Sequence, residues 1–341
     1  MRTLIKWAGG KTSELETIKK YMPETFNRIV EPFVGGGALF LDMESTKTLA
    51  NDFSPELIKF YEIVGTADFF LLKEIISKLH EQRIRALNLP INGGFLEEAA
   101  KINSHKSFNQ YLDREIKSKI KRIAKINMAR AITGDSPLSD EEVAIQYRTA
   151  VTGALYYVYR EIYNDAHQAQ ALDVNHIAYW YVVKQLAFSG MTRYSTSGKF
   201  NVPYAGISYD SRSLVHNLEI MESAHNAPFY QSTEFRTGDF EKFFEEFDYF
   251  DVDDFIFVDP PYDDGFTKYN SKGDFTREDQ IRLRDTIKKS SAKVMLLVKQ
   301  TDFITSLYES DFNIQTFNKN YSVNLKNRNK QDVQHLIITN Y

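Results

Sequence analysis

The chain has 341 residues, of which 43% are hydrophobic, and a formal net charge of −4. Such a chain has enough apolar residues for about two folded domains, and its charge argues against a general polyanion binder. The absence of cysteine excludes disulfides, thiolate metal ligands and a thiol nucleophile. No apolar run approaches the roughly 18 residues needed to span a membrane, so no membrane contact is expected. The absence of cysteine makes a cytoplasmic protein the expected class.

The first 63 residues alternate between predicted strands and helices. In order, we expect a helix over 13–22, a strand over 27–33, a helix over 38–43, a strand over 46–51 and a helix over 55–61. The run Val34-Gly35-Gly36-Gly37 follows the first strand, and Asp52 follows the second. This order is typical of the opening of a doubly wound α/β sheet.

The middle of the chain, residues 64–190, is charged and mainly helical in period. Residues 114–130 carry seven Lys or Arg against one Glu. Four apolar residues recur there at helical spacing and are expected beneath the basic face: Ile116, Ile120, Ile123 and Met128. Residues 189–209 are rich in Gly, Ser, Thr and Tyr, which predicts a turn or β-hairpin.

The strand–helix alternation returns near residue 228. We expect strands over 229–235, 255–258, 293–299 and 336–339, an extended segment over 314–317, and helices over 240–247, 278–289 and 303–309. Thr276 is a suitable N-cap for the second of these helices. The chain is thus predicted to be an α/β domain of residues 1–63 and 215–341, interrupted by a largely helical insertion of residues 64–214.

The strand over 255–258 leads directly into Asp259-Pro260-Pro261-Tyr262. Prolines end a strand because they cannot donate to the ladder, so Asp259 and Tyr262 lie where α/β sheets bind ligands. Asp259 and the Pro260 carbonyl offer two acceptors to a planar –NH₂ group, and Tyr262 can stack on the base that carries it. The pattern suits attack by an aromatic amine on a methyl donor, without a metal or a nucleophilic side chain.

The glycine run predicts a close approach of the backbone to a second ligand. It is not a dinucleotide fingerprint, because position 40 is Phe40, and Ala8-Gly9-Gly10-Lys11-Thr12 lacks the first glycine of a phosphate loop. Asp52 is placed to accept hydrogen bonds from ribose hydroxyls. Asp239 can accept from an adenine amino group while Phe240 packs on the ring, or Asp239 can simply cap a helix. The expected ligand is a nucleoside with little negative charge.

Together these motifs resemble the Dam-like, α-group (D12 class) DNA adenine-N6 methyltransferases. Asp259-Pro260-Pro261-Tyr262 is similar to their motif IV, and residues 31–37 are similar to their S-adenosylmethionine loop, motif I. Residues 6–11, Lys6-Trp7-Ala8-Gly9-Gly10-Lys11, resemble motif X. Arg193-Tyr194 and residues 199–204 are similar to part of the family's target-recognition region, whereas residues 65–150 match no motif.

The resemblance implies a Rossmann-like, S-adenosylmethionine-dependent methyltransferase sheet with an inserted target-recognition domain and a β-hairpin. It implies catalytic roles for Asp259, Pro260 and Tyr262. The implied cofactor-binding residues are Trp7, Lys11, Phe33, Gly35, Gly37, Asp52, Asp239, Phe240 and Asp259. The implied DNA-binding residues are Lys6, Phe188, Ser189, Arg193, Lys199, Asn201 and Tyr204.

Within that family a hairpin residue fills the gap left by the extruded adenine. Phe188 and Ser189 occupy the corresponding place here, where Dam-like enzymes tend to have Tyr and Asn, so the target sequence is left open. Arg193 aligns with an arginine that reads a base, with a phosphate contact or a surface charge as the alternative. Lys326, Arg328 and Lys330 are further candidates for phosphate contacts.

The resemblance therefore predicts a site-specific adenine-N6 methyltransferase that acts on a flipped base in double-stranded DNA. Cytosine-N4 methylation is the nearest alternative, because the same two acceptors can orient either amine. A catalytically silent DNA-binding protein on the same fold is the alternative from another class. We expect a prokaryotic or phage-encoded protein, either an orphan methylase or the partner of a restriction endonuclease.

Overall fold

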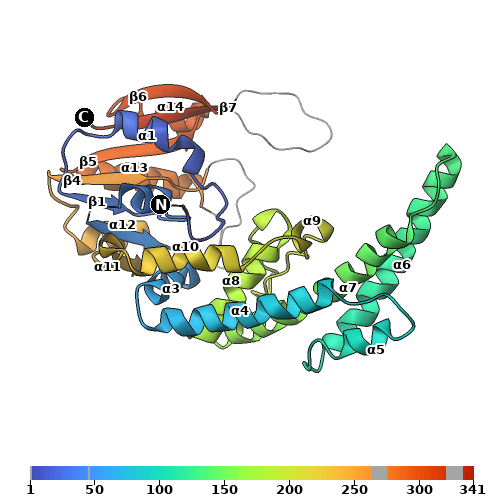
Figure 1. Ribbon diagram of the computed structural model, residues 1–341. Helices are drawn as coiled ribbons and strands as arrows, with labels where there is room; N and C mark the ends of the chain where they lie inside the picture. Colours follow the sequence, from blue (N-terminus) through green and yellow to red (C-terminus); the bar gives the residue numbers. More distant parts are fainter. Residues whose placement is uncertain (1, 45–46, 263–274, 320–332) are drawn as a thin grey trace. The chain divides into compact units, whose positions relative to one another are not determined.

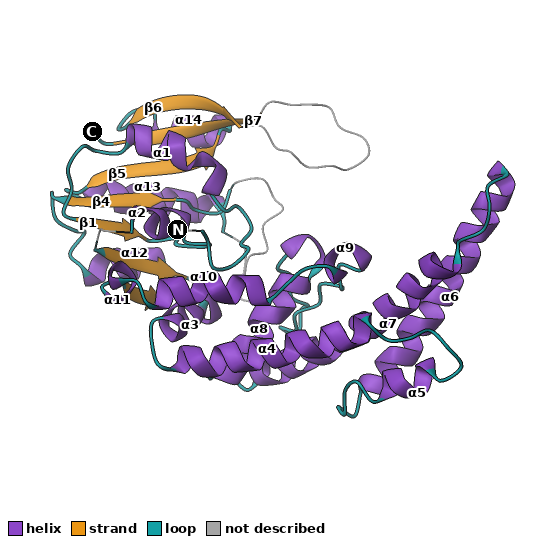
Figure 2. Cartoon of the chain, in the orientation of Figure 1, coloured by secondary structure: helices purple, strands orange, loops and turns teal. Residues whose placement is uncertain are grey.

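The computed structural model describes residues 2–44, 47–262, 275–319 and 333–341. The chain divides into two compact units, one made of Met1–Gly65 and Glu222–Tyr341 and the other of Thr66–Met221. The first unit contains a β-sheet with helices, and the second is almost wholly helical (Figure 2). Helix α10 (Val215–His225) carries the chain from the second unit back to the first.

The described part of the first unit holds one seven-stranded sheet of order β3-β2-β1-β4-β5-β7-β6 (Figure 1). Its strands are β1 (Arg28–Glu31), β2 (Thr48–Asp52), β3 (Glu234–Thr237), β4 (Asp254–Val258), β5 (Lys293–Lys299), β6 (Asn313–Lys319) and β7 (Val333–Thr339). The strands from β3 to β5 pair in parallel, whereas β7 runs antiparallel to both β5 and β6. The predicted Rossmann-like α/β architecture is thereby confirmed.

Helices cover both faces of this sheet, which explains why residues 29–30 of β1 and 255–258 of β4 are both apolar and buried. On one face Phe255 and Phe257 of β4 pack with Ile18 and Leu39. The alternate residues of β4 face the opposite core, with helices α12 to α14. The helices of this unit are α1 (Leu15–Tyr21), α2 (Ala38–Met43), α3 (Pro55–Val64), α11 (Pro228–Gln231), α12 (Phe240–Glu246), α13 (Arg277–Lys289) and α14 (Asp302–Tyr308), with the 3₁₀ turn η1 (Thr12–Glu14).

The amino ends of the central strands are joined by an ion pair. Arg28 Nε and Nη2 donate to the two carboxylate oxygens of Asp254 at 3.1 and 2.7 Å. Asp254 is buried, and its carboxylate holds the pKa of Arg28 above the usual value through this side-chain hydrogen bond. The pair fixes the β1–β4 register at the amino ends of these strands, so their carboxyl ends are left for a site.

The second unit is built mainly from three long helices, α4 (Asp68–Leu87), α6 (Phe108–Thr133) and α7 (Asp140–Gln168), with shorter helices around them. The shorter helices are α5 (Phe95–Ala100), α8 (Val174–Leu186) and α9 (Ile207–Asp210), with the 3₁₀ turn η2 (Phe188–Gly190). Within this unit α6 and α7 lie side by side (Figure 1). A capping box of Ser139 and Glu142 starts α7. Among the described residues, no helix is both long and apolar enough to cross a membrane.

Three local expectations differ from the structure. The predicted strand over 229–235 was wrong, because Pro228 begins the short helix α11 and the strand β3 starts only at Glu234. The segment after α8 folds back through two isolated antiparallel bridges, Ala187 with Tyr204 and Tyr194 with Phe200. It therefore turns as a hairpin would, but without a continuous ladder.

The third difference concerns α6. Ile116 is buried, but Ile120 and Met128 are 49% and 68% exposed, so the predicted apolar underside of the basic face was wrong for these two residues. The helical spacing was right, but the helix extends beyond the core against which its first turns pack.

The Arg28–Asp254 pair gives a stability prediction. Replacing Asp254 with Ala leaves the Arg28 guanidinium without its buried acceptor, and we expect a loss of about 1–3 kcal/mol in the free energy of unfolding. Urea denaturation measures it. The matched control is Asp311→Ala, which breaks the exposed pair with Lys288 and should leave the midpoint unchanged. Equal midpoints for the two variants would contradict the role assigned to the buried pair.

Candidate functional site

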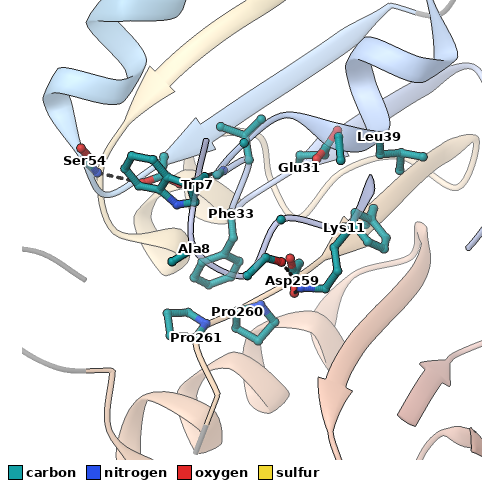
Figure 3. A pocket seen from close by; sticks show the side chains of 18 of the residues that line it. Trp7, Ala8, Lys11, Glu31, Phe33, Leu39, Ser54, Asp259, Pro260 and Pro261 are labelled. Carbon is teal, nitrogen blue, oxygen red and sulfur yellow. Dashed lines mark hydrogen bonds and ion pairs between the residues drawn. The ribbon is translucent and has the colours of Figure 1, made fainter. Parts of the chain in front are cut away.

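A pocket of about 890 Å³, part of it open to solvent, lies at the carboxyl ends of the central strands (Figure 3). Its walls come from the N-terminal segment and from the turns that follow β1, β2 and β4. The lining residues with chemistry to offer are Trp7, Lys11, Glu31, Phe33, Gly35, Asp52, Asp259, Pro260 and Tyr262. The pairing of β1 with β2 and β4 brings these segments together, although they are far apart in the sequence.

The turn after β1 is shaped by its glycines. Gly35 and Gly37 have φ values of +48° and +69°, which favour glycine over other residues. A Cβ at Gly35 would lie 3.1 Å from Cδ1 of Trp7, and one at Gly37 would lie 2.4 Å from Cε1 of Phe40. The Tyr61 hydroxyl of α3 donates to the Gly35 carbonyl at 2.8 Å and so fixes the turn to that helix. Glycine is therefore required at both positions by the backbone conformation and by the nearby Trp7 and Phe40 rings, and the close approach of this turn to a ligand stays a prediction.

Asp52 ends β2 beside this turn. One of its carboxylate oxygens accepts from the Gly35 N–H at 3.0 Å, and the other accepts from the Ser54 N–H at 2.9 Å. These bonds fix the orientation of the carboxylate within the pocket. The carboxylate also lines the pocket, and a carboxylate can accept hydrogen bonds from the hydroxyls of a ligand.

The turn after β4 brings Asp259 against Lys11. The Lys11 ammonium lies 2.6 Å from Oδ1 of Asp259 and also donates to the Gly9 carbonyl at 2.7 Å. It lies 5.1 Å from the centre of the Tyr262 ring, within the range of a cation–π contact. Lys11 thus bonds to Asp259, the first residue of the Asp-Pro-Pro-Tyr turn, and faces the ring of Tyr262, its last residue.

Two further residues support this turn and were not found from the sequence. Gln280 of α13 is buried and donates to the Pro261 carbonyl at 3.0 Å. His335 of β7 meets the Tyr262 ring edge-on, with centroids 5.4 Å apart. Neither contact has a local sequence signal, because each joins segments that only the folded sheet brings together.

Glu31 is a third residue that sequence reasoning missed. Its carboxylate lines the pocket and accepts from the Phe40 N–H at 2.9 Å. Burial raises the pKa of Glu31 to about 8, with a smaller contribution in the same direction from Asp259 and an opposing one from the Phe40 hydrogen bond. Glu31 lies in the segment that resembles motif I, but that resemblance indicates a role for Phe33 and the glycines and none for Glu31.

Asp239 and Phe240 lie outside the residues that line the pocket. Asp239 caps α12 by accepting from the Glu241 N–H, and its carboxylate pairs with Arg282 at 3.0 Å. The Phe240 ring packs against Phe33, with centroids 5.5 Å apart, and Phe33 itself lines the pocket. Of the two roles considered for Asp239, cofactor contact and helix cap, the structure shows the helix cap. Phe240 packs behind Phe33 and does not line the pocket.

The residues expected to contact DNA lie mainly in the second unit. Phe188 is 49% exposed, and the neighbouring Ser189 is exposed with φ of +54°. The Arg193 side chain donates to Oδ1 of Asn201 at 2.7 Å across the bridged turn. The turn is anchored by Asn164, whose side chain bonds to both the N–H and the carbonyl of Phe200.

The remaining DNA candidates differ in their surroundings. Lys199 is exposed, whereas the Tyr204 hydroxyl donates to Asp210, which also accepts from Thr149 and Thr152. Lys6 is exposed in the first unit. Three expected phosphate contacts lie outside the described residues: Lys326, Arg328 and Lys330.

The sheet order, the glycine turn and the Asp-Pro-Pro-Tyr turn in one pocket define the methyltransferase class that the sequence resembles. A family model for D12 class N6 adenine-specific DNA methyltransferases matches residues 7–323. The chain therefore belongs to this family, which confirms the predicted family and supports adenine over cytosine as the methylated base.

Relatives of similar length match along nearly the whole chain. The Type II methyltransferase M1.LlaDCHI of Lactococcus lactis subsp. cremoris is 28% identical, and the match covers 100% of this chain and 96% of the relative. A DNA adenine methylase of Vibrio cholerae is 27% identical over 97% and 94% of the two chains. The Type II methyltransferase M.CviBI of Paramecium bursaria Chlorella virus NC1A is 24% identical over the full length of both.

The buried Glu31 carboxyl predicts a pH-dependent stability. Its folded-state pKa of about 8 lies above the ordinary value of 4.5, so between these values the folded state binds more protons than the unfolded state. Stability from this group is then present at low pH and is lost as pH rises. Glu31→Gln should therefore gain stability over the wild type by about 1 kcal/mol per pH unit across this window. Denaturant unfolding at several pH values measures the difference, and a constant difference would contradict it.

Proposed function

We propose that the pocket binds S-adenosylmethionine and that the chain moves its methyl group to N6 of an adenine flipped out of duplex DNA. The observation that carries this proposal is the Asp259–Pro260–Pro261–Tyr262 turn at the edge of the pocket, bonded to Lys11. Membership of the family supports adenine in DNA as the substrate. The remaining steps assign roles to this chain's own residues.

The groups that line the pocket fit the proposed cofactor. Gly35 and Gly36 line the pocket with backbone alone, and Asp52 carries a carboxylate suited to ribose hydroxyls. Trp7 and Phe33 supply flat apolar walls, and Glu31 supplies a buried acceptor for an ammonium group. When bound, S-adenosylmethionine supplies an electrophilic methyl group.

Asp259 and the Pro260 carbonyl are proposed to accept the two hydrogens of the adenine amine. This arrangement directs the nitrogen lone pair away from both acceptors and toward the methyl donor. The Asp259 carboxylate also stabilises the positive charge that develops on the attacking nitrogen. Lys11 fixes the orientation of that carboxylate through Oδ1.

Tyr262 is proposed to stack on the flipped adenine, a contact worth about 1–3 kcal/mol. Its ring is held edge-on by His335, so the stacking surface is fixed before the base arrives. In the second unit, Phe188 and Ser189 are proposed to fill the gap in the duplex, and Arg193 to read a base edge. Lys6, Lys199, Asn201 and Tyr204 are proposed to contact DNA around them. We further propose that residues 64–214 serve target recognition.

The cellular setting is also a proposal. The names of two relatives, both Type II methyltransferases, support a role beside a restriction endonuclease, and the names of others support an orphan or phage methylase. A DNA substrate supports a cytoplasmic location in a prokaryotic cell or during phage infection. Sequencing methylated host DNA by a modification-sensitive method would give the recognition site and distinguish these settings.

The proposed reaction is tested with duplex DNA and labelled S-adenosylmethionine. Digestion of the product to nucleosides should give labelled N6-methyladenine. Labelled N4-methylcytosine would instead support the cytosine alternative. DNA binding without any incorporation of label would support the catalytically silent protein and contradict the proposal.

Asp259→Ala should lower the methylation rate by about 10²–10³-fold, because it removes an acceptor aimed at the reacting amine. Single-turnover kinetics with cofactor in excess measure this rate, and direct cofactor binding is measured in parallel. Asp253→Ala is the matched control, since it removes an exposed carboxylate just before β4. A wild-type rate in Asp259→Ala would exclude the proposed catalytic role.

A further inference from the structure

Helix α6 carries cations for which the described part of the chain shows no ion-pair partner. Three of the basic residues in 114–130 are paired: Arg114 with Glu115, Lys117 with Asp113, and Arg130 with Glu142. Lys121, Arg122 and Lys125 are exposed, and among the described residues no ion pair engages them. In a chain of net charge −4, this is a local concentration of positive charge.

These cations lie on one face of the helix. The buried residues of α6 are Phe108, Leu112 and Ile116, all in its first turns. The helical period places Lys121 and Lys125 opposite that buried row, because each residue advances the helix by about 100°. Burial, followed by the charge of Arg122, lowers the pKa of Lys119, which is consistent with a local excess of positive charge.

The same face continues with exposed apolar side chains. Met128 and Ile132 are 68% and 83% exposed and follow Lys121 and Lys125 at spacings of three and four residues. Together the four residues form a stripe along about 16 Å of helix. Duplex DNA carries one phosphate per about 3.4 Å of helix axis on each strand, so a stripe of this length can meet several phosphates. Its aliphatic end suits contact with deoxyribose.

We propose that this α6 stripe, Lys121, Lys125, Met128 and Ile132 with Arg122 beside it, is a second DNA-binding surface. It contacts the phosphate backbone of duplex DNA without reading sequence, and it is distinct from the bridged turn at residues 187–206 that carries Arg193. The inference rests on the proposed reaction with duplex DNA. Backbone contacts of this kind fix the position of a protein on DNA and make its affinity depend on salt.

The test uses the full-length protein and a long random-sequence duplex. The variant K121E/R122E/K125E is compared with K78E/K101E/K106E, which reverses three exposed lysines elsewhere in the second unit and changes the net charge equally. DNA affinity is measured by fluorescence anisotropy between about 50 and 200 mM salt. Removing three phosphate contacts should reduce the slope of log affinity against log salt by about 2–3 and weaken binding roughly tenfold or more at low salt. The control should keep the wild-type slope.

An unchanged slope in the stripe variant would overturn the proposal. So would an equal loss in both variants, because net charge and not the stripe would then explain it. If the reversed variant does not fold, as judged by its unfolding curve, the neutral variant K121Q/R122Q/K125Q is measured, and its slope should fall by a similar amount.

A second copy of the chain is the competing occupant of the apolar end. Sedimentation of the wild type and of M128S/I132S measures this directly, and a dimer that only the wild type forms would overturn the proposal. The proposed function fails separately. If the wild type incorporates no label into DNA, the proposed reaction is wrong. If the wild type methylates DNA but the stripe variant keeps the wild-type salt slope, the reaction stands and only the proposed α6 surface is wrong.

Discussion

The parallel pairing of β1 between β2 and β4 is the constraint on which the site depends. Because parallel strands end at the same edge, this pairing brings Glu31, Asp52 and Asp259 to one pocket. The antiparallel β7 then extends the sheet and supplies His335 to the Tyr262 ring. The residues proposed to act on the amine lie in the turn after β4. The strands on either side hold that turn in position.

The pocket is also held by contacts that are easily overlooked because they involve the backbone. Asn51 donates to the Pro32 and Gly238 carbonyls, so one buried amide joins the turns that follow β1 and β3. Tyr61 donates to the Gly35 carbonyl of the glycine turn, and Gln280 donates to the Pro261 carbonyl of the Asp-Pro-Pro-Tyr turn. Each bond satisfies a carbonyl that bends out of regular structure, and together they preorganise the site before any ligand binds.

Local patterns predicted much of this arrangement. Apolar runs, prolines and glycines marked the central strands, and the motif order indicated which turns share a pocket. Long-range contacts were not predictable in this way. Nothing near Asp239 in the sequence indicates that Arg282 occupies its carboxylate, and helical spacing alone does not reveal that the core beneath α6 ends at Ile116. The strand expected over 229–235 failed for a local reason, because Pro228 favours a helix start.

The shortness of the buried row on α6 has a consequence for how the second unit unfolds. Beyond Ile116 the helix has no buried side chain, so its later turns are held by backbone hydrogen bonds and half-buried contacts. Such a segment opens at a lower free energy than the core, as a separate cooperative unit. Amide hydrogens in these turns should exchange with solvent long before those of α8, whose residues are buried on nearly every side. The chain can therefore gain or lose turns at this end of α6 without disturbing the sheet.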